Sequence, residues 1–346
     1  MTKKGALIAL IVLASCSHEE LVEPVTKATA IAFSADMSEQ AETRTATPLE
    51  DYTTSFRVWA FKNMTEADGS YGNLQTVMNQ YHVEWTEGTA ATTTTNSRDW
   101  EYILLGYPEQ TVKFWDWSAK AYRFFGSAEM STTLGTWEHI TEGTECYKYT
   151  CTVDATNAGD APFYTHLWFS TGDATDYPTR QFGHPVTLEF IKPFAEVRFL
   201  FTYSDPDADP LPMLEDPVFR PVTPETRIAM KGEVIITFPL VGTDTQDTWT
   251  STPDLSSKYL VSFTTPDTRY TVLPVRGQCA YTLTVTVNGA DRSCSVPAQY
   301  MEWHPGCLYT YVFKVNDEGG VELQTVNIGV KSWVDADPAN HYLYNW

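Results

Sequence analysis

The sequence has 346 residues, and its 44 acidic against 23 basic residues give a formal net charge of −21. A chain this acidic repels phosphate backbones, so nucleic acid is excluded as a partner. The length is sufficient for two domains of ordinary size. Aromatic residues make up 14% of the chain, and 20 prolines and 19 glycines are spread along it. This composition is typical of many short strands separated by turns, and predicts an all-β protein.

The first sixteen residues have the features of a secretory signal peptide. Lys3 and Lys4 precede an apolar run over residues 6–13, and small residues follow it. The run is much shorter than the roughly 20 residues that cross a bilayer. The ending Leu13-Ala14-Ser15-Cys16 resembles a bacterial lipobox. That resemblance implies a signal peptide over residues 1–15, lipidation of Cys16, and a membrane contact through the lipid anchor. The alternative is an ordinary signal peptide in which the cysteine is incidental.

Residues 16–29 are polar and acidic near their start, and we interpret them as a lipidated tether. The acidic residues after Cys16 resemble a surface-export signal of Bacteroides-type lipoproteins, which implies exposure at the outer membrane. The alternative is a solvated leader that carries no export signal.

Period-two alternation of apolar residues predicts strands through most of the remaining chain. In the first, over residues 30–35, Ile31 and Phe33 share a face. Residues 63–79 and 86–99 are expected to be loops. The other predicted strands cover residues 56–61, 100–105, 111–117, 122–125, 147–153, 186–190, 195–203, 234–238, 259–263, 281–287 and 309–315, and a last strand contains Val326, Ile328 and Val330.

A polar loop follows the first predicted strand. Residues 36–48 contain almost no large apolar side chain, and Arg44 is their only basic residue. A lone arginine in an exposed loop predicts a trypsin-like cleavage site at Arg44. The alternative is an ordinary loop between two strands.

A proline-rich and acidic stretch divides the strand patterns into two groups. Prolines cannot donate to a sheet ladder, so we expect a linker over residues 205–226. The fold prediction is two tandem β-sandwich domains after the signal peptide, over residues 30–204 and 227–346.

The cysteines give no disulfide framework. Cys146 and Cys151 lie in one predicted strand, about 16 Å apart, which is too far for a direct bond. In the hairpin after residue 281, burial favours a four-residue loop that places Val285 opposite Cys294 rather than Arg292. We therefore expect buried free thiols rather than disulfides.

No catalytic, cofactor-binding or metal-binding residue is predicted. The sequence lacks Gly-x-Ser-x-Gly, His-Glu-x-x-His and phosphate-binding Gly-Lys motifs, and no two histidines have metal-ligand spacing. Asp205, Asp207, Asp209 and Asp216 begin a calcium-loop pattern, but Pro210 stands where glycine is needed. We interpret this stretch as an acidic linker and the chain as a non-enzyme.

Several ordered segments together resemble the Bacteroides-type fimbrillins, which are lipoprotein-derived subunits of the type V pilus. Each segment is a loose match, and their order along the chain is the specific feature. They are the lipobox, Ile31-Ala32-Phe33-Ser34-Ala35 followed by Thr43-Arg44-Thr45, Tyr107-Pro108 followed by Val112-Lys113-Phe114-Trp115-Asp116-Trp117-Ser118, Phe194-Ala195-Glu196-Val197-Arg198-Phe199, Trp303-His304-Pro305-Gly306-Cys307-Leu308-Tyr309-Thr310-Tyr311, and residues 326–333.

The resemblance implies two transthyretin-like sandwiches and assembly into a pilus with other subunits, as stalk, tip or anchor. In polymerising members, an arginine-specific protease cuts the loop after the first strand, and a strand from a neighbouring subunit fills the opened groove. Arg44 is the matching position. Ile31 and Phe33 would belong to the displaced strand, and Val326, Ile328 and Val330, or the tail after them, to the donor strand. The resemblance also implies a receptor on a host or bacterial surface as a further partner.

The main alternative is a surface lipoprotein that binds glycans. Exposed aromatic side chains stack on sugars, and the chain has eleven tryptophans. Trp115, Trp117 and Trp303 lie in strand patterns, however, where large aromatic side chains are mostly in the core. An exposed row of tryptophans on one face would favour this alternative.

Overall fold

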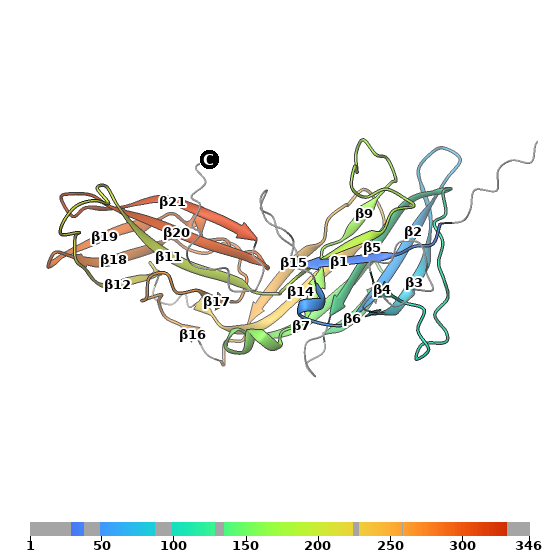
Figure 1. Cartoon of the computed structure of the whole chain (residues 1–346), viewed down its shortest axis with the longest axis horizontal. Helices are drawn as coiled ribbons and strands as arrows, with labels where there is room; N and C mark the ends of the chain where they lie inside the picture. The colour runs from blue at the N-terminus through green and yellow to red at the C-terminus, as the bar shows by residue number, and fades with distance from the viewer. Residues whose placement is uncertain are drawn as a thin grey trace, which may run out of the picture.

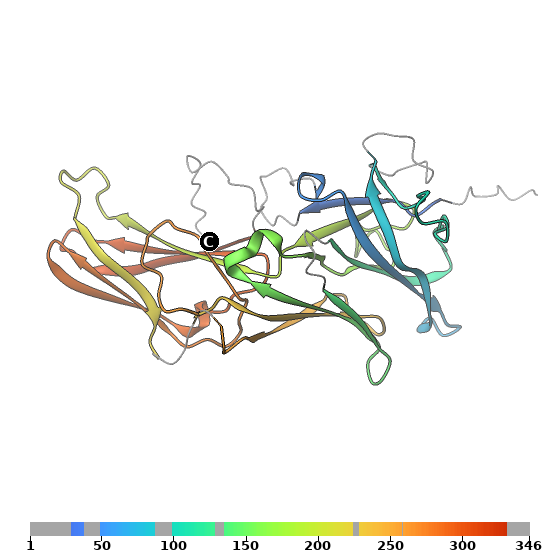
Figure 2. The ribbon, with the colours of Figure 1, turned by 90° about the horizontal axis from the view of Figure 1, so that it is seen from below.

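The computed structural model describes residues 29–37, 49–86, 99–128, 135–223, 228–257 and 259–330. These residues form an all-β protein, as the sequence predicts, with short 3-10 segments at Leu49–Asp51, Ala155–Asp160 and Ala298–Tyr300. The molecule is elongated, with an eight-stranded sheet at one end, two smaller sheets at the other end and a four-stranded sheet between them (Figures 1 and 2). Among the described residues, no helix is long and apolar enough to cross a membrane.

The first sheet closes on itself around an aromatic core. Its strand order is β2-β3-β4-β1-β10-β8-β5-β9, and β2 also pairs with β5. The core inside it takes side chains from all of these strands. The bounds are β1 Phe33–Met37, β2 Ser55–Thr65, β3 Tyr71–Trp85, β4 Trp100–Glu101, β5 Ala119–Ala128, β8 Phe163–Thr165, β9 Trp168–Ser170 and β10 Val186–Ile191.

A four-stranded sheet packs against the outer face of the first sheet. Its order is β15-β14-β7-β6, and the core between the two sheets includes Trp59, Phe125 and Phe238. The strands are β6 Thr136–Ile140, β7 Cys146–Asp154, β14 Lys231–Pro239 and β15 Thr248–Pro253.

The other end of the molecule is a sandwich of two sheets around a third core. One sheet has the order β17-β11-β20-β21 and the other β12-β18-β19. The strands are β11 Ala195–Tyr203, β12 Leu214–Pro221, β17 Tyr270–Val272, β18 Tyr281–Val287, β19 Ala290–Val296, β20 Cys307–Val315 and β21 Val321–Val330; β13 Ile228–Ala229 and β16 Tyr259–Leu260 form a small separate pair.

The chain crosses between the two ends more often than a linker at residues 205–226 allows. β11, which lies before the predicted linker, pairs with β20 over eight residue pairs. β14, which lies after it, pairs with β7 over nine. The proline-rich stretch itself contains β12, which pairs with β18. The predicted linker is therefore wrong as a boundary between sheets, because prolines are tolerated in an edge strand such as β12.

Other local predictions need correction as well. Residues 71–79 belong to β3 rather than to a loop, and residues 111–117 contain only an isolated bridge at Phe114. In the β18–β19 hairpin, Val285 pairs with Arg292, and Cys294 pairs with Leu283. The turn residues Asn288 and Gly289 have φ of 51° and 78°, which suits a two-residue turn.

Arg292 tolerates this register because its side chain does not have to enter the core. It is half-buried, and its Nε donates to the Gly319 carbonyl at 3.0 Å. A long side chain can cover apolar surface with its stem while its charge stays at the edge. Among the described residues, Cys146 and Cys151 are free and buried, whereas the free thiols Cys279, Cys294 and Cys307 are only half-buried.

Candidate functional site: the groove that holds β1

The candidate site is the space between β10 and β4 that β1 fills, which we call the β1 groove. β1 runs parallel to β10, with a register from Phe33 opposite Val186 to Met37 opposite Phe190. On its other edge, Phe33 pairs with Trp100 of β4. β1 is therefore paired along its length with β10 and at Phe33 with β4, and it closes the sheet between them.

The residues just before β1 extend this pairing. Ala30 forms an antiparallel bridge with Phe114. The Ile31 amide donates to the Lys113 carbonyl at 2.8 Å, and the Trp115 amide donates to the Thr29 carbonyl at 3.0 Å. The segment from Thr29 to the end of β1 is thus held by main-chain bonds, which depend little on side-chain identity.

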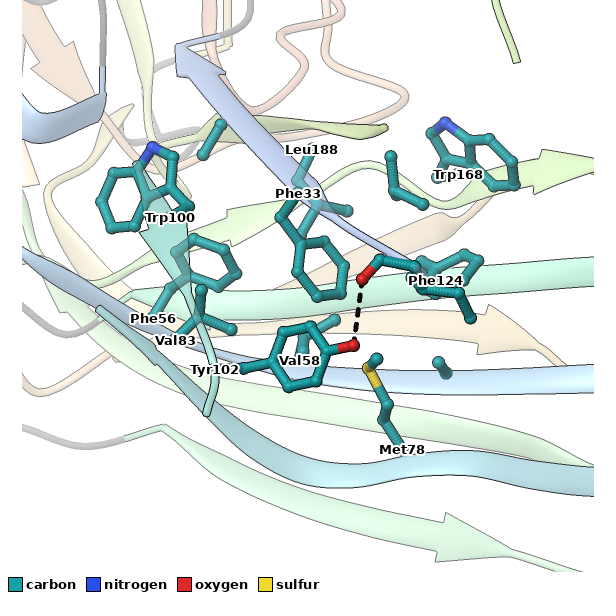
Figure 3. Close-up of a cluster of buried hydrophobic side chains, with 14 of the residues drawn as sticks. Phe33, Phe56, Val58, Met78, Val83, Trp100, Tyr102, Phe124, Trp168 and Leu188 are labelled. Carbon is teal, nitrogen blue, oxygen red and sulfur yellow. Dashed lines mark hydrogen bonds between the residues drawn. The ribbon is translucent and has the colours of Figure 1, made fainter. Parts of the chain in front are cut away.

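One face of this segment lies in the first core. Ile31, Phe33, Ala35 and Met37 are each at most 3% exposed. Figure 3 shows Phe33 pointing into a group of aromatic and aliphatic side chains from several strands. Fully burying a large apolar side chain such as Phe33 contributes about 1.5–3 kcal/mol. The strand therefore supplies part of the core as well as closing the sheet.

The Phe33 ring has the most specific surroundings. Its centroid lies 6.1 Å from Phe56, 5.8 Å from Tyr102 and 6.1 Å from Phe124, and each pair meets edge to face. This is a favoured arrangement of aromatic rings, worth about 0.5–1.5 kcal/mol per pair beyond area burial. We call the space enclosed by Phe56, Tyr102 and Phe124 the Phe33 pocket.

The hydroxyl of Tyr102 also bonds the backbone of the strand. It donates to the Ile31 carbonyl at 2.9 Å and accepts from the Lys113 amide at 3.1 Å. The first of these bonds is the dashed line in Figure 3. Tyr102 is fully buried, and burial raises the pKa of its hydroxyl above the ordinary value, so the group stays protonated and can donate.

The opposite face of the strand is covered as well. Ala32 is 1% and Ser34 3% exposed. The Ser34 hydroxyl lies 2.8 Å from the Thr187 hydroxyl on β10, where the two residues are direct register partners. A strand buried on both faces and paired on both edges has the environment of a central strand, although it lies near the start of the chain.

The structure places some of the residues predicted from the sequence and leaves others outside its description. Ile31 and Phe33 lie in the core, but β1 begins at Phe33 and ends at Met37, later than the predicted 30–35. Cys16 and Arg44 lie outside the described residues. The displacement of the strand, cleavage at Arg44 and lipidation of Cys16 stay predictions.

The predicted donor residues lie in a different sheet from the one that contains β1. Val326 and Ile328 belong to β21, the edge strand of the sheet β17-β11-β20-β21 (Figure 1). Val326 packs against the third core, whereas Ile328 is 64% exposed. Val330 pairs with Cys307 at the end of the strand. Donation of this strand stays a prediction.

Sequence reasoning misses Tyr102 and Thr187 as parts of the groove. Residue 102 stands in a predicted strand with nothing to distinguish it, and Thr187 is expected only to face outward. No local pattern identifies them, because β1 meets β10 across more than 150 residues of sequence.

The described residues contain no candidate metal-binding cluster and a single exposed tryptophan. Among them, no group of three or more histidine, cysteine, aspartate or glutamate side chains could hold a metal ion. Trp115 and Trp303 are buried, while Trp117 is 61% exposed. Within the part of the chain that the structure covers, Trp117 stands alone as an exposed tryptophan, so no exposed row is seen there.

No model of a known protein family matches the sequence, and no curated protein does. Solved structures with a similar arrangement include a fimbrial protein from Bacteroides vulgatus, with a TM-score of 0.39, 12% identity, and coverage of 88% of this chain and 99% of that one. A protein from Bacteroides ovatus whose name refers to cell adhesion has a TM-score of 0.38 and 10% identity, with coverage of 90% of this chain and 99% of that one. A fimbrial assembly protein from Parabacteroides distasonis has a TM-score of 0.35 and 11% identity, with coverage of 86% of this chain and 98% of that one. With identities and TM-scores this low, these similarities carry no argument about the function of this chain.

Proposed function

We propose that the chain is a structural or adhesive subunit of a surface pilus, as stalk, tip or anchor. In this proposal it is exported as a precursor lipidated at Cys16, and it assembles by donor-strand exchange after cleavage at Arg44. The observation that carries the proposal is the position of β1, which completes a core and a sheet and is followed directly by the segment that contains Arg44. The sequence resemblance to fimbrillins supports the same reading.

The covalent connection of β1 supports a role as a removable strand. On its C-terminal side, the strand joins the rest of the domain only through residues 38–48, which contain Arg44. A cut there leaves β1 held by hydrogen bonds and packing alone.

Loss of β1 would create a strong acceptor for another strand. It would leave unpaired main-chain groups on β10 and beside Trp100, and expose the apolar core around the Phe33 pocket. Open sheet edges of this kind are satisfied by strand addition, in which main-chain bonds give strength and alternate side chains give fit.

The pairing of β21 bears on the choice of donor strand. β21 is bonded to β20 along its length, from Val321 opposite Val315 to Val330 opposite Cys307. Donating Val326, Ile328 and Val330 would cost these bonds in the donating subunit. The residues after Val330 lie outside the described residues, and the resemblance to fimbrillins makes them the alternative donor.

Digestion of the folded protein with an arginine-specific protease tests the proposal. We expect one dominant cut, a new N-terminus at Thr45, and multimers that grow with protein concentration on size-exclusion chromatography. An Arg44→Gln variant is the matched control and should stay whole and monomeric. Equal cutting at many arginines, or a clean cut at Arg44 that leaves only monomers, would contradict the proposal.

A further inference from the structure

The core-facing side chains of β1 and of the residues before it differ in size and in surroundings. Ile31, Phe33, Ala35 and Met37 all face the core, and the Phe33 ring meets three aromatic rings edge to face. Two residues later, Ala35 is buried with a single methyl group. A larger side chain at that position would have to displace close-packed neighbours.

Tyr102, which forms one wall of the Phe33 pocket, also hydrogen-bonds the main chain just before β1. Around the Ala30–Phe114 bridge, the Ile31 amide bonds the Lys113 carbonyl. In a regular antiparallel ladder the Lys113 amide would bond the Ile31 carbonyl in return. Here the Tyr102 hydroxyl stands between them, accepting from Lys113 and donating to Ile31. The same side chain therefore holds the carbonyl of residue 31 and forms a wall of the pocket for residue 33.

We infer that the Phe33 pocket selects which strand the groove accepts and in which register. The preferred occupant carries an aromatic side chain at the pocket and a small side chain two residues later. A slip of one residue would turn the core-facing side chains outward, and a slip of two would place Ala35 or Ile31 in the pocket. Phe56, Tyr102 and Phe124 are thus the specificity-determining residues of the groove.

For an incoming strand, this inference rests on the proposed function. It specifies the partner as another subunit whose donor strand contains an aromatic residue followed two positions later by a small one. Val326, Ile328 and Val330 do not have this pattern, because none of them is aromatic. A second copy of β21 would leave the pocket underfilled, so multimers of this chain alone would be held more weakly than a complex with a donor that has the pattern.

The register of the resident strand tests the pocket without any strand exchange. In the double variant Phe33→Ala/Ala35→Phe, the aromatic side chain is moved by two residues. If the pocket sets the register, β1 shifts so that the relocated aromatic ring fills it, and residue 36 then lies opposite residue 187. Cysteine pairs report this shift: Ser34→Cys with Thr187→Cys traps the native register, and Asp36→Cys with Thr187→Cys traps the shifted one.

Oxidation followed by peptide mass spectrometry measures the two products in each background. With Phe33 and Ala35 unchanged, we expect the disulfide between positions 34 and 187. In the Phe33→Ala/Ala35→Phe background, which we call the moved-aromatic variant, the disulfide between positions 36 and 187 should exceed the one between positions 34 and 187 by roughly tenfold or more. Persistence of the 34–187 product would overturn the inference. A moved-aromatic variant that fails to fold, while Phe33→Ala alone folds, would overturn it too, because the strand then cannot shift to fill the pocket.

Peptide binding to the protein cleaved at Arg44 tests the partner. A peptide of residues 29–37 should bind at least about tenfold more tightly than the same peptide with the aromatic moved to position 35. A peptide of residues 324–330 is the second comparison and should bind weakly. Equal binding of the three peptides would overturn the selectivity of the pocket. If no peptide binds but the disulfide experiment shows the shifted register, the proposed function is contradicted while the role of the pocket in positioning β1 stands.

Discussion

Replacing Phe33 with alanine is expected to lower the free energy of unfolding by about 3–5 kcal/mol, the usual cost of emptying a buried aromatic site. The ring is fully buried and meets Phe56, Tyr102 and Phe124 edge to face, so its loss leaves a cavity between rigid neighbours. A domain is typically stable by only about 5–15 kcal/mol, so the change is a large share of the total. Urea unfolding followed by tryptophan fluorescence measures it.

Phe114→Ala is the matched control for this variant. Phe114 lies beside the same segment, in the bridge with Ala30, but its side chain is 49% exposed. Its replacement should cost below about 1 kcal/mol, as expected for a surface position. Similar losses in the two variants would mean that β1 is not an integral part of the core.

Joining β1 to β10 by a disulfide is expected to abolish assembly of the cleaved protein. Ser34 and Thr187 are direct register partners with hydroxyls 2.8 Å apart, so cysteines at these two positions have suitable spacing for a bond. The oxidised Ser34→Cys/Thr187→Cys variant should be cut at Arg44 as readily as the parent protein. Its strand cannot leave, so size-exclusion chromatography should show monomer alone.

Reduction supplies the internal control for the disulfide variant. Adding a reductant should restore multimers to the level of the Thr187→Cys single variant, since the native thiols are free in both. If the oxidised variant assembles as well as the reduced one, assembly does not require β1 to leave the groove.

The strands of this protein could be predicted where alternation is strong and burial is on one face. β18 is such a case, because Tyr281, Leu283, Val285 and Val287 all face the core. The alternation of Ile31 and Phe33 likewise predicted a buried N-terminal strand. β3 escaped prediction because its residues are mostly exposed or half-buried, so its polar sequence resembles a loop.

The pairing of strands could not be read from the sequence in the same way. β1 lies beside β10, and β14 beside β7, across long stretches of chain. Local pattern records which face of a strand is apolar but not which partner lies next to it. The proline-rich stretch illustrates the limit, because its composition is typical of a linker and yet it contains the edge strand β12.

The residues that form the Phe33 pocket could not be identified from the sequence for the same reason. Phe56, Tyr102 and Phe124 come from three separate segments, and only the closed sheet brings their rings together. The sequence indicated that Phe33 would be buried. The structure adds that a tyrosine hydroxyl, through its bond to Ile31, holds the strand at a defined position.

The mass of the chains inside the multimers tests the central claim most directly. After cleavage at Arg44, multimers are isolated by size exclusion, denatured, and weighed by intact mass spectrometry beside the remaining monomer. If β1 leaves as another strand enters, multimers contain chains that begin at Thr45, while the fragment ending at Arg44 is recovered apart from them. A fragment retained in equal amount with every chain of the multimer would show that the groove never exchanged its strand.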